Sequence, residues 1–131
     1  MTILQFRYSQ NECPASMIAA LRALTGLSIA DIRNRIAMSQ PLFEIIPFRR
    51  DWVETRYKLV KITKQIAAGT LPLNVTEESN GFVTPVSLPM LQNIIHQLRQ
   101  IELETQTDIS LETGDIDDPN DFMPQDADWT Q

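Results

Sequence analysis

In this chain of 131 residues, the stretch that indicates the fold most clearly is residues 21–36, LRALTGLSIADIRNRI. The apolar residues in and before the stretch recur at helical spacing: Met17, Ile18, Leu21 and Leu24. A helix is therefore expected over residues 15–24, and it ends at Gly26 because glycine takes the left-handed conformation without a steric cost. Ser28 is a good N-terminal cap for a second helix over residues 29–38. The stretch predicts two short helices joined by a tight glycine turn.

Short strands are predicted on both sides of this helix pair. Residues 2–8, TILQFRY, show the alternation of a first strand, and residues 42–46, LFEII, read as a second. Residues 71–76 and 81–86 predict a hairpin, and a proline in each segment limits it to the edge of a sheet. Residues 108–112, DISLE, place apolar residues at alternate positions and predict a last strand.

Two longer segments predict further helices. Residues 88–104 are the clearest amphipathic helix of the chain. Its buried side is expected to hold Leu91, Ile94, Ile95, Leu98 and Ile101, and its exposed side Gln92, Gln97, Arg99 and Gln100. Residues 51–68 carry a broad apolar stripe that stops at Gly69 and favours a helix. A strand remains the alternative for residues 51–62, which are rich in strand-forming side chains.

These elements predict the α+β class. The expected architecture is a small single-layer β-sheet packed on helices, in the order β-α-α-β-(α, hairpin insertion)-α-β. Residues 1–113 are expected to form a single domain. Residues 114–131 are acidic, interrupted by proline and without periodicity, so they are expected to be an acidic C-terminal tail.

Charge is distributed unevenly along the chain, whose net charge is −6. Residues 1–101 contain all 11 lysines and arginines and seven acids, which gives +4. Residues 102–131 contain ten acids and no base, which gives −10. The positive charge is concentrated further in residues 49–64. An asymmetry of this size between segments is typical of an interaction tail.

The acidic tail also carries aromatic residues, which a tail needed only for solubility lacks. Aromatic side chains supply much of the binding energy at protein interfaces, and the surrounding charges steer the encounter. We therefore expect the tail to hold a basic protein partner, or to lie in cis on the basic segment 49–64. The candidate contacts are Asp115, Asp117, Asp118, Asp121, Phe122, Asp126, Asp128 and Trp129. The alternative is a solubilising tail and a basic stretch that is only a solvated helix face.

The stretch 21–36 resembles the helix–Thr-Gly-Leu–helix core of the C-terminal domain of the bacterial ribosomal stalk protein, and the Clp protease adaptor is similar in architecture. The resemblance implies a strand, two helices, a strand, a helix and a strand. Residues 49–87 depart from it, because that domain passes almost directly from its second strand to its third helix. Its lysine-rich factor-binding surface is replaced here by three arginines, Arg22, Arg33 and Arg35. The resemblance therefore implies a fold and not the recruitment of translation factors.

The sequence offers little for catalysis. The single cysteine, Cys13, and the single histidine, His96, leave a Cys–His pair as one alternative, although the helix of His96 supplies no general acid or nucleophile nearby. The four glycines are too far apart for a phosphate-binding loop. The tail aspartates lack the glycine and the final glutamate of a calcium loop. We expect no enzyme activity, no cofactor and no metal.

Charge and hydropathy also disfavour several partners. A segment of charge −10 repels a phosphate backbone over roughly 8–10 Å, so nucleic acid is not expected to bind. No apolar run approaches the roughly 18–20 residues of a membrane span, so no membrane association is expected. The N-terminal MTILQFRYSQ has no secretory signal pattern. A cytoplasmic location is expected.

The expected function is therefore that of a non-enzymatic protein-binding protein. Its most concrete form is an immunity or antitoxin protein that neutralises a basic bacterial toxin by occupying its cleft. The alternative is an adaptor or translation-associated module of ribosomal-stalk or Clp-adaptor type, whose binding surface would map to residues 15–38. Two further alternatives are an enzyme that uses Cys13 and His96, and a phage or mobile-element protein that binds through the hairpin.

Overall fold

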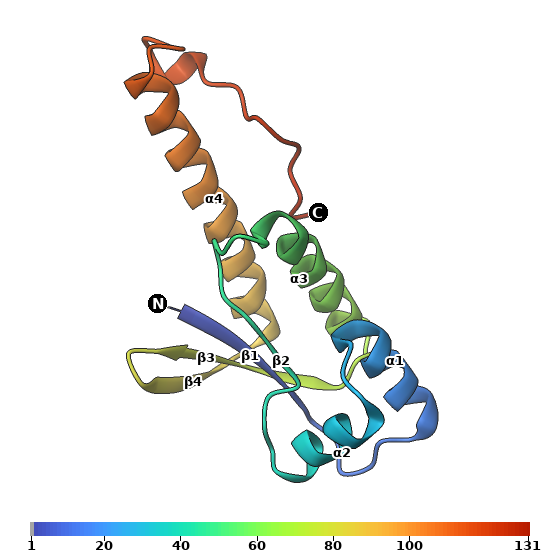
Figure 1. Ribbon diagram of the computed structural model, residues 1–131. Helices are drawn as coiled ribbons and strands as arrows, with labels where there is room; N and C mark the ends of the chain where they lie inside the picture. The colour runs from blue at the N-terminus through green and yellow to red at the C-terminus, as the bar shows by residue number, and fades with distance from the viewer. Residues whose placement is uncertain (1) are drawn as a thin grey trace.

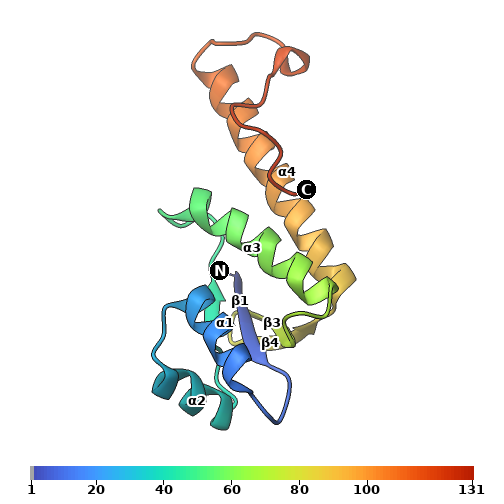
Figure 2. The same cartoon turned by 90° about the vertical axis from the view of Figure 1, so that its right-hand side faces the viewer.

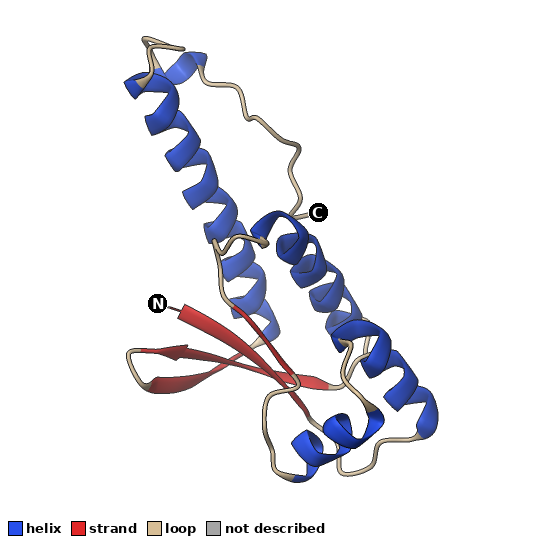
Figure 3. Cartoon of the chain, viewed as in Figure 1, coloured by secondary structure: helices blue, strands red, loops and turns tan. Residues whose placement is uncertain are grey.

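A computed structural model describes residues 2–131 (Figure 1). It contains one antiparallel sheet and four α-helices, which confirms the α+β class (Figure 3). The elements in chain order are β1 (Thr2–Tyr8), α1 (Ala15–Thr25), α2 (Ile29–Ala37), β2 (Phe43–Ile45), α3 (Trp52–Ala67), β3 (Leu73–Ser79), β4 (Phe82–Val86), α4 (Leu88–Glu112) and the 3-10 turn η1 (Pro119–Asp121).

The predicted helix pair forms as the sequence requires. Gly26 has φ +72° and its N–H donates to the carbonyl oxygen of Arg22, which closes α1 with a left-handed residue. The Ser28 hydroxyl accepts a hydrogen bond from the N–H of Asp31 and caps α2. Residues 51–62, for which a strand remained an alternative, are helical as part of α3.

The sheet has the strand order β2-β1-β3-β4, so the first strand of the chain lies inside it. All three strand pairs are antiparallel, with Leu4 opposite Ile45 of β2 and Phe6 opposite Val75 of β3. These side chains belong to the buried core, to which α1, α3 and α4 contribute Leu21, Leu59 and Leu91. In Figure 1, α3 and α4 lie above the sheet.

The centre of the opposite sheet face is polar and satisfies its own hydrogen bonds. The Gln5 amide donates to the Glu78 carboxylate at 3.1 Å, and the Thr76 hydroxyl donates to Gln5 at 3.2 Å. Arg7 adds a bond to the Thr76 hydroxyl at 2.7 Å. A sheet with one apolar and one polar face is typical of a single-layer α+β fold.

Both edges of the sheet are poor templates for another strand. β3 and β4 are joined by the two-residue turn Asn80–Gly81, with φ +53° and +82°. In such a hairpin alternate residues direct their backbone groups to the free edge, and Pro85 is one of these in β4. Because proline has no N–H, this edge lacks a donor. The other edge strand, β2, has three residues and carries the exposed Glu44.

The prediction of a last strand over residues 108–112 was wrong. Nothing between residues 104 and 112 interrupts the helix, so α4 continues for 25 residues, until Gly114 with φ +81° turns the chain. Two alternating apolar residues, Ile109 and Leu111, carry too little periodicity to distinguish a strand from the end of a helix.

The predicted faces of the helices also need correction. Arg99, expected on the exposed side of α4, is buried, and Ile101, expected on the buried side, is exposed. The apolar side chains of Val53 in α3 and Met38 after α2 are exposed as well. For Arg99 the reason is a pair of carboxylates that reach it from α4 and from the C-terminal segment.

The distal part of α4 extends away from the sheet, and the C-terminal segment returns beside it (Figure 1, Figure 2). We call residues 103–125 the acidic arm. Its helical part, about ten residues, adds roughly 15 Å at the usual rise of 1.5 Å per residue. Both ends of the arm are fixed to the body, one through α4 and the other through the residues described next.

Candidate functional site

Trp129 attaches the C-terminal segment to the core. Its side chain is only 3% exposed and joins the main cluster of buried residues. Its ring meets that of Trp52 edge-on, with centroids 5.7 Å apart. The guanidinium of Arg56 lies 5.6 Å from the Trp129 ring centroid, within the range of a cation–π contact. The last residues of the chain are therefore packed against α3.

Four charged side chains surround the two tryptophans. Arg56 of α3 binds Glu102 at 2.7 Å and Asp126 at 2.7 Å, one carboxylate for each terminal nitrogen. Arg99 of α4 reaches the same two carboxylates, at 3.3 Å and 2.9 Å. The cluster holds two positive and two negative charges and is electrically balanced, which is the condition under which charges are tolerated inside a protein.

Glu102 is the centre of this cluster. Its Oε2 accepts hydrogen bonds from the Trp52 indole N–H at 2.8 Å and from Arg56 at 2.7 Å. Its Oε1 accepts from the Trp129 indole N–H at 2.6 Å and from Arg99 at 3.3 Å. Each carboxylate oxygen thus has two donors, which fills the acceptor capacity of the group. We call these six residues the anchor: Trp52, Arg56, Arg99, Glu102, Asp126 and Trp129.

The anchor keeps its charges at ordinary pH. Burial acts to raise the pKa of Asp126, but hydrogen bonds from Arg99 and Arg56 outweigh it and lower the pKa to about 2. Burial likewise opposes the hydrogen bonds from Trp129, Arg56 and Trp52 that lower the pKa of Glu102. The pKa values of both arginines are raised, because the hydrogen bonds to these carboxylates exceed the effect of burial. These shifts favour the ionised forms of all four charged groups of the anchor at neutral pH.

One atom of the anchor has no partner. Within residues 2–131, the buried Nε–H of Arg56 donates no hydrogen bond. The remaining nitrogens of Arg56 are occupied by Glu102 and Asp126. The ring centroids of Tyr57 and Trp129 lie 5.5 Å and 5.6 Å from the guanidinium carbon of Arg56, within the range of cation–π contacts.

The acidic arm has the opposite character. It contains seven acids and no base: Glu104, Asp108, Glu112, Asp115, Asp117, Asp118 and Asp121. All seven are exposed. Within the described part of the chain, the four ion pairs all belong to the anchor, so none of these acids has a basic partner. The arm is a solvent-exposed surface of charge −7.

Local hydrogen bonds shape the arm. Asp118 accepts from the N–H of Asn120 at 3.0 Å and starts the turn η1. Gln106 of α4 accepts from the N–H of Gln125 at 3.3 Å, which ties the returning segment to the helix. Phe122 is half-buried, whereas Met123 is 79% exposed. The arm therefore presents carboxylates together with an exposed apolar side chain.

The structure divides the eight residues expected to contact a partner into two groups. Asp115, Asp117, Asp118, Asp121 and Phe122 lie on the arm, away from the anchor. Asp126 and Trp129 belong to the anchor. Asp128 is exposed next to it and accepts hydrogen bonds from the N–H and hydroxyl of Thr130, which lower its pKa. The cis attachment to the segment 49–64 runs through the ion pair of Arg56 with Asp126 and the ring contact of Trp52 with Trp129.

Sequence reasoning missed three members of the anchor as functional residues: Trp52, Arg99 and Glu102. Arg99 and Glu102 are three positions apart on one helix, a spacing that brings side chains together. That signal was available. The contact of Trp129 with a glutamate 27 positions earlier has no local signal.

The other candidate residues lie apart from the anchor network. Cys13 is half-buried before α1, where burial and then the Cys13 thiol raise the pKa of Tyr8. His96 is exposed on α4. Among residues 2–131 no group of three or more histidines, cysteines and acids is placed to hold a metal ion.

No single helix of the described chain is both long and apolar enough to cross a membrane; α1 and α2 reach that level only together, across a bend of 103°. Comparison of the chain with protein-family models, with curated proteins and with solved structures finds no match.

Proposed function

We propose that this chain is a non-enzymatic, cytoplasmic protein that binds a basic protein partner through its acidic arm. In its most concrete form the chain is an immunity or antitoxin protein, which neutralises a basic bacterial toxin by occupying its cleft. One observation carries the proposal: seven exposed carboxylates without a basic partner among residues 2–131 lie between two attachments to the body.

The physical argument starts from repulsion. Like charges held close together raise the free energy of the folded chain. The approach of a cationic surface lowers this free energy again. A disordered tail would lose conformational entropy on binding, whereas the arm is already attached at both ends and loses less. Long-range attraction also speeds the encounter with a basic cleft. The arrangement supports fast, salt-dependent protein binding.

The eight candidate residues then have two roles. Asp115, Asp117, Asp118, Asp121 and Phe122 would contact the partner. Asp126 and Trp129 would position the arm, and Asp128 lies at its base. This division changes how the proposal must be tested, because deletion of residues 114–131 would remove the anchor together with the contact surface and would leave Arg56 and Arg99 with one carboxylate fewer.

The test uses a variant that neutralises the arm and keeps the anchor: Asp117→Asn, Asp118→Asn and Asp121→Asn. The matched control removes three exposed acids from the body: Glu12→Gln, Glu44→Gln and Glu54→Gln. Each chain is immobilised and exposed to extract from the native cell, and captured proteins are identified and purified. Each purified partner is then assayed for toxicity, with and without a stoichiometric amount of each chain.

The proposal expects a basic protein that the wild type and the control capture and the arm variant loses. Its toxic activity should be blocked by the wild type and the control only. A partner held equally well by the arm variant would overturn the role of the arm. An arm-dependent partner without toxic activity would overturn the immunity function and leave a basic partner in place.

A second candidate is the adaptor or translation-associated module. The first four elements support it, because a strand, two helices and a strand open the order that the resemblance of residues 21–36 implies. In this case binding would map to α1 and α2. Reversing the exposed charges Arg22→Glu and Arg33→Glu would abolish partner binding, and the arm variant would bind normally.

A further inference from the structure

The exposed side of α3 carries three lysines that have no carboxylate within ion-pair distance among residues 2–131: Lys58, Lys61 and Lys64. Lys58 is half-buried, and burial lowers its pKa. Its nearest charge-stabilising contact is the ring of Phe43, 5.4 Å from Nζ. An approaching carboxylate stabilises the charged form of a partly desolvated ammonium group. This side of α3 is therefore a site that favours an anionic ligand.

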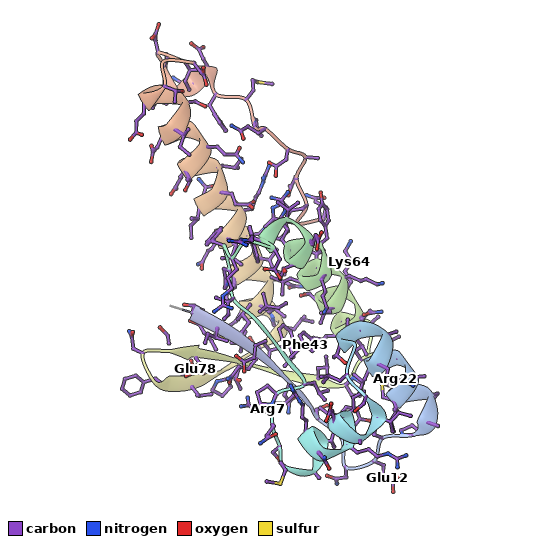
Figure 4. The ribbon with its side chains drawn as sticks, in the orientation of Figure 1. Arg7, Glu12, Arg22, Phe43, Lys64 and Glu78 are labelled. Carbon is purple, nitrogen blue, oxygen red and sulfur yellow. The ribbon has the colours of Figure 1, made fainter. Side chains whose placement is uncertain are left out.

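Two adjoining depressions flank this row of lysines, and Tyr57, Lys61 and Gln65 line both. The one between α3 and α1 has a volume of about 530 Å³ and includes Leu24 and Leu71. The other has a volume of about 560 Å³ and includes Val60 and Trp129. We call the two together the α3 groove. In Figure 4, Lys64 marks its position on α3.

The groove has the chemistry to receive an acidic segment with apolar side chains. Its rim is cationic, apolar residues of α1, α3 and the core line it, and each depression has the size that holds a few side chains. The side toward α1 has two lysines and no acid in its lining, whereas the other side also has Asp128. An acidic ligand should therefore favour the side toward α1.

The tip of the acidic arm is such a segment. Residues 115–123, DIDDPNDFM, combine four aspartates with Ile116, Phe122 and Met123. Met123 is 79% exposed, which leaves it free for a contact. The tip and the groove are thus complementary in charge and in apolar character.

The tip cannot reach the groove of its own chain in this structure. It lies at one end of the molecule and α1 lies at the other, as both views show (Figure 1, Figure 2). Residues 103–112 of α4 carry the tip roughly 15 Å beyond Glu102, in the direction away from α1. A second copy of the chain can place its arm tip in the groove. In a dimer with two-fold symmetry, each tip would occupy the groove of the other copy.

We propose that the α3 groove is a docking site for the arm tip of a second copy of this chain. Carboxylates of the tip pair with Lys58 and Lys61, and an apolar side chain of the tip enters beside Leu24 and Leu71. The proposal does not rest on the proposed function, since the groove lies outside the arm. It adds a consequence: self-association and a basic partner compete for the same tip.

Two charge reversals test the contact. The groove variant is Lys58→Glu and Lys61→Glu, the two lysines that line the side toward α1. The tip variant is Asp117→Lys and Asp121→Lys, which spares Asp118 and its cap. The matched control, Arg49→Glu and Arg50→Glu, makes the same change in net charge at exposed positions before α3. Sedimentation velocity measures the mass of each chain across a concentration series, at about 0.1 M and about 1 M salt, where the screening length falls from roughly 10 Å to 3 Å.

The wild type and the control should associate at low salt and dissociate at high salt. Each reversed variant alone should associate at least about tenfold more weakly, because two attractions become repulsions. An equimolar mixture of the two variants should restore association, since each reversed tip then meets a groove of opposite charge. Circular dichroism melting verifies that each variant is folded. If a reversed variant is not folded, the neutral variants Lys58→Gln, Lys61→Gln and Asp117→Asn, Asp121→Asn replace it.

A wild type that stays monomeric throughout would overturn the proposal. So would a mixture that fails to associate, or a control that loses association as the groove variant does. Failure here leaves the proposed function standing, because the groove variant retains an intact arm and should bind the basic partner as the wild type does. A groove that takes an unrelated acidic peptide, with no self-association, would also contradict the inference.

Discussion

The indole nitrogen of Trp129 lies 2.6 Å from Oε1 of Glu102, 27 positions earlier in the chain. Trp52 of α3 holds the other oxygen of the same carboxylate at 2.8 Å. One buried side chain of α4 thereby connects a helix of the body and the end of the chain. The acidic arm between Glu102 and Trp129 is a closed loop, and its exposure follows from this attachment.

Replacement of Glu102 tests the centre of the anchor. Glu102→Gln removes the charge that balances Arg56 and Arg99 and leaves buried guanidinium groups underpaired. The free energy of unfolding should fall by about 3–5 kcal/mol, the usual cost of breaking a buried ion pair from one side. Urea denaturation measures it. The exposed Glu104→Gln, two positions along, should change stability by less than about 0.5 kcal/mol. Equal effects of the two substitutions would contradict the anchor.

Two substitutions of Trp129 distinguish the contribution of its packing to stability from that of its hydrogen bond. Trp129→Ala should cost about 3–5 kcal/mol of unfolding free energy, because it removes a buried ring. Trp129→Phe keeps an aromatic ring and loses the indole donor, so about 1–3 kcal/mol is expected. Met123→Ala, on the exposed arm, is the control and should be nearly neutral. If Trp129→Ala were neutral in chemical denaturation, the C-terminal segment would not be docked in solution.

Acid should weaken the anchor through Asp126. Its folded-state pKa of about 2 lies below its usual value of 3.8, so its contribution to stability is complete above about pH 5 and is lost as the pH falls toward 2. Asp126→Asn lacks this contribution at every pH. The stability difference between wild type and Asp126→Asn should therefore shrink by up to about 2 kcal/mol from pH 5 to pH 2, as urea titrations at each pH measure.

The matched control for this titration is Asp117→Asn, which makes the same chemical change on the exposed arm. Its difference from the wild type should follow a different course with pH than that of Asp126→Asn. A stability difference for Asp126→Asn that stays constant, or grows, on acidification would show that the carboxylate is unpaired in solution.

Loss of the anchor should release the arm without unfolding the body. In Trp129→Ala, amide hydrogen exchange should accelerate in residues 106–112 and 119–129, where the returning segment and α4 support each other. Exchange in β1 and β3 should stay slow, since these strands lie inside the sheet. Uniform acceleration over the whole chain would indicate that the arm and the body unfold as one unit.

The sequence carries the local part of this fold well. Gly26 and Ser28 specify the turn between α1 and α2 through backbone conformation and capping, which depend on neighbouring residues alone. The amphipathic stripes of α3 and α4 likewise follow from spacing. Where a segment is short, as in residues 108–112, the periodicity is ambiguous. This segment is helical because it continues α4, which begins 20 residues earlier.

The anchor depends on contacts that spacing does not encode. Periodicity assigns Arg99 to the exposed side of α4, and charge makes Asp126 and Trp129 look like free tail residues. The contact of Arg99 with Asp126, at 2.9 Å, joins a buried arginine to a half-buried aspartate, and the reversal of the chain at Gly114 brings the two together. A long-range ion pair of this kind can be recognised from the folded structure, and not from the spacing of its residues in the sequence.

Hydrogen exchange of the complex with the captured basic partner tests the central claim most directly. The account predicts that binding protects residues 115–123 and the adjoining end of α4, and leaves the polar sheet face around Gln5 and Thr76 unchanged. Protection confined to α1, α2 or the β3–β4 hairpin, with residues 115–123 exchanging as in the free chain, would contradict it.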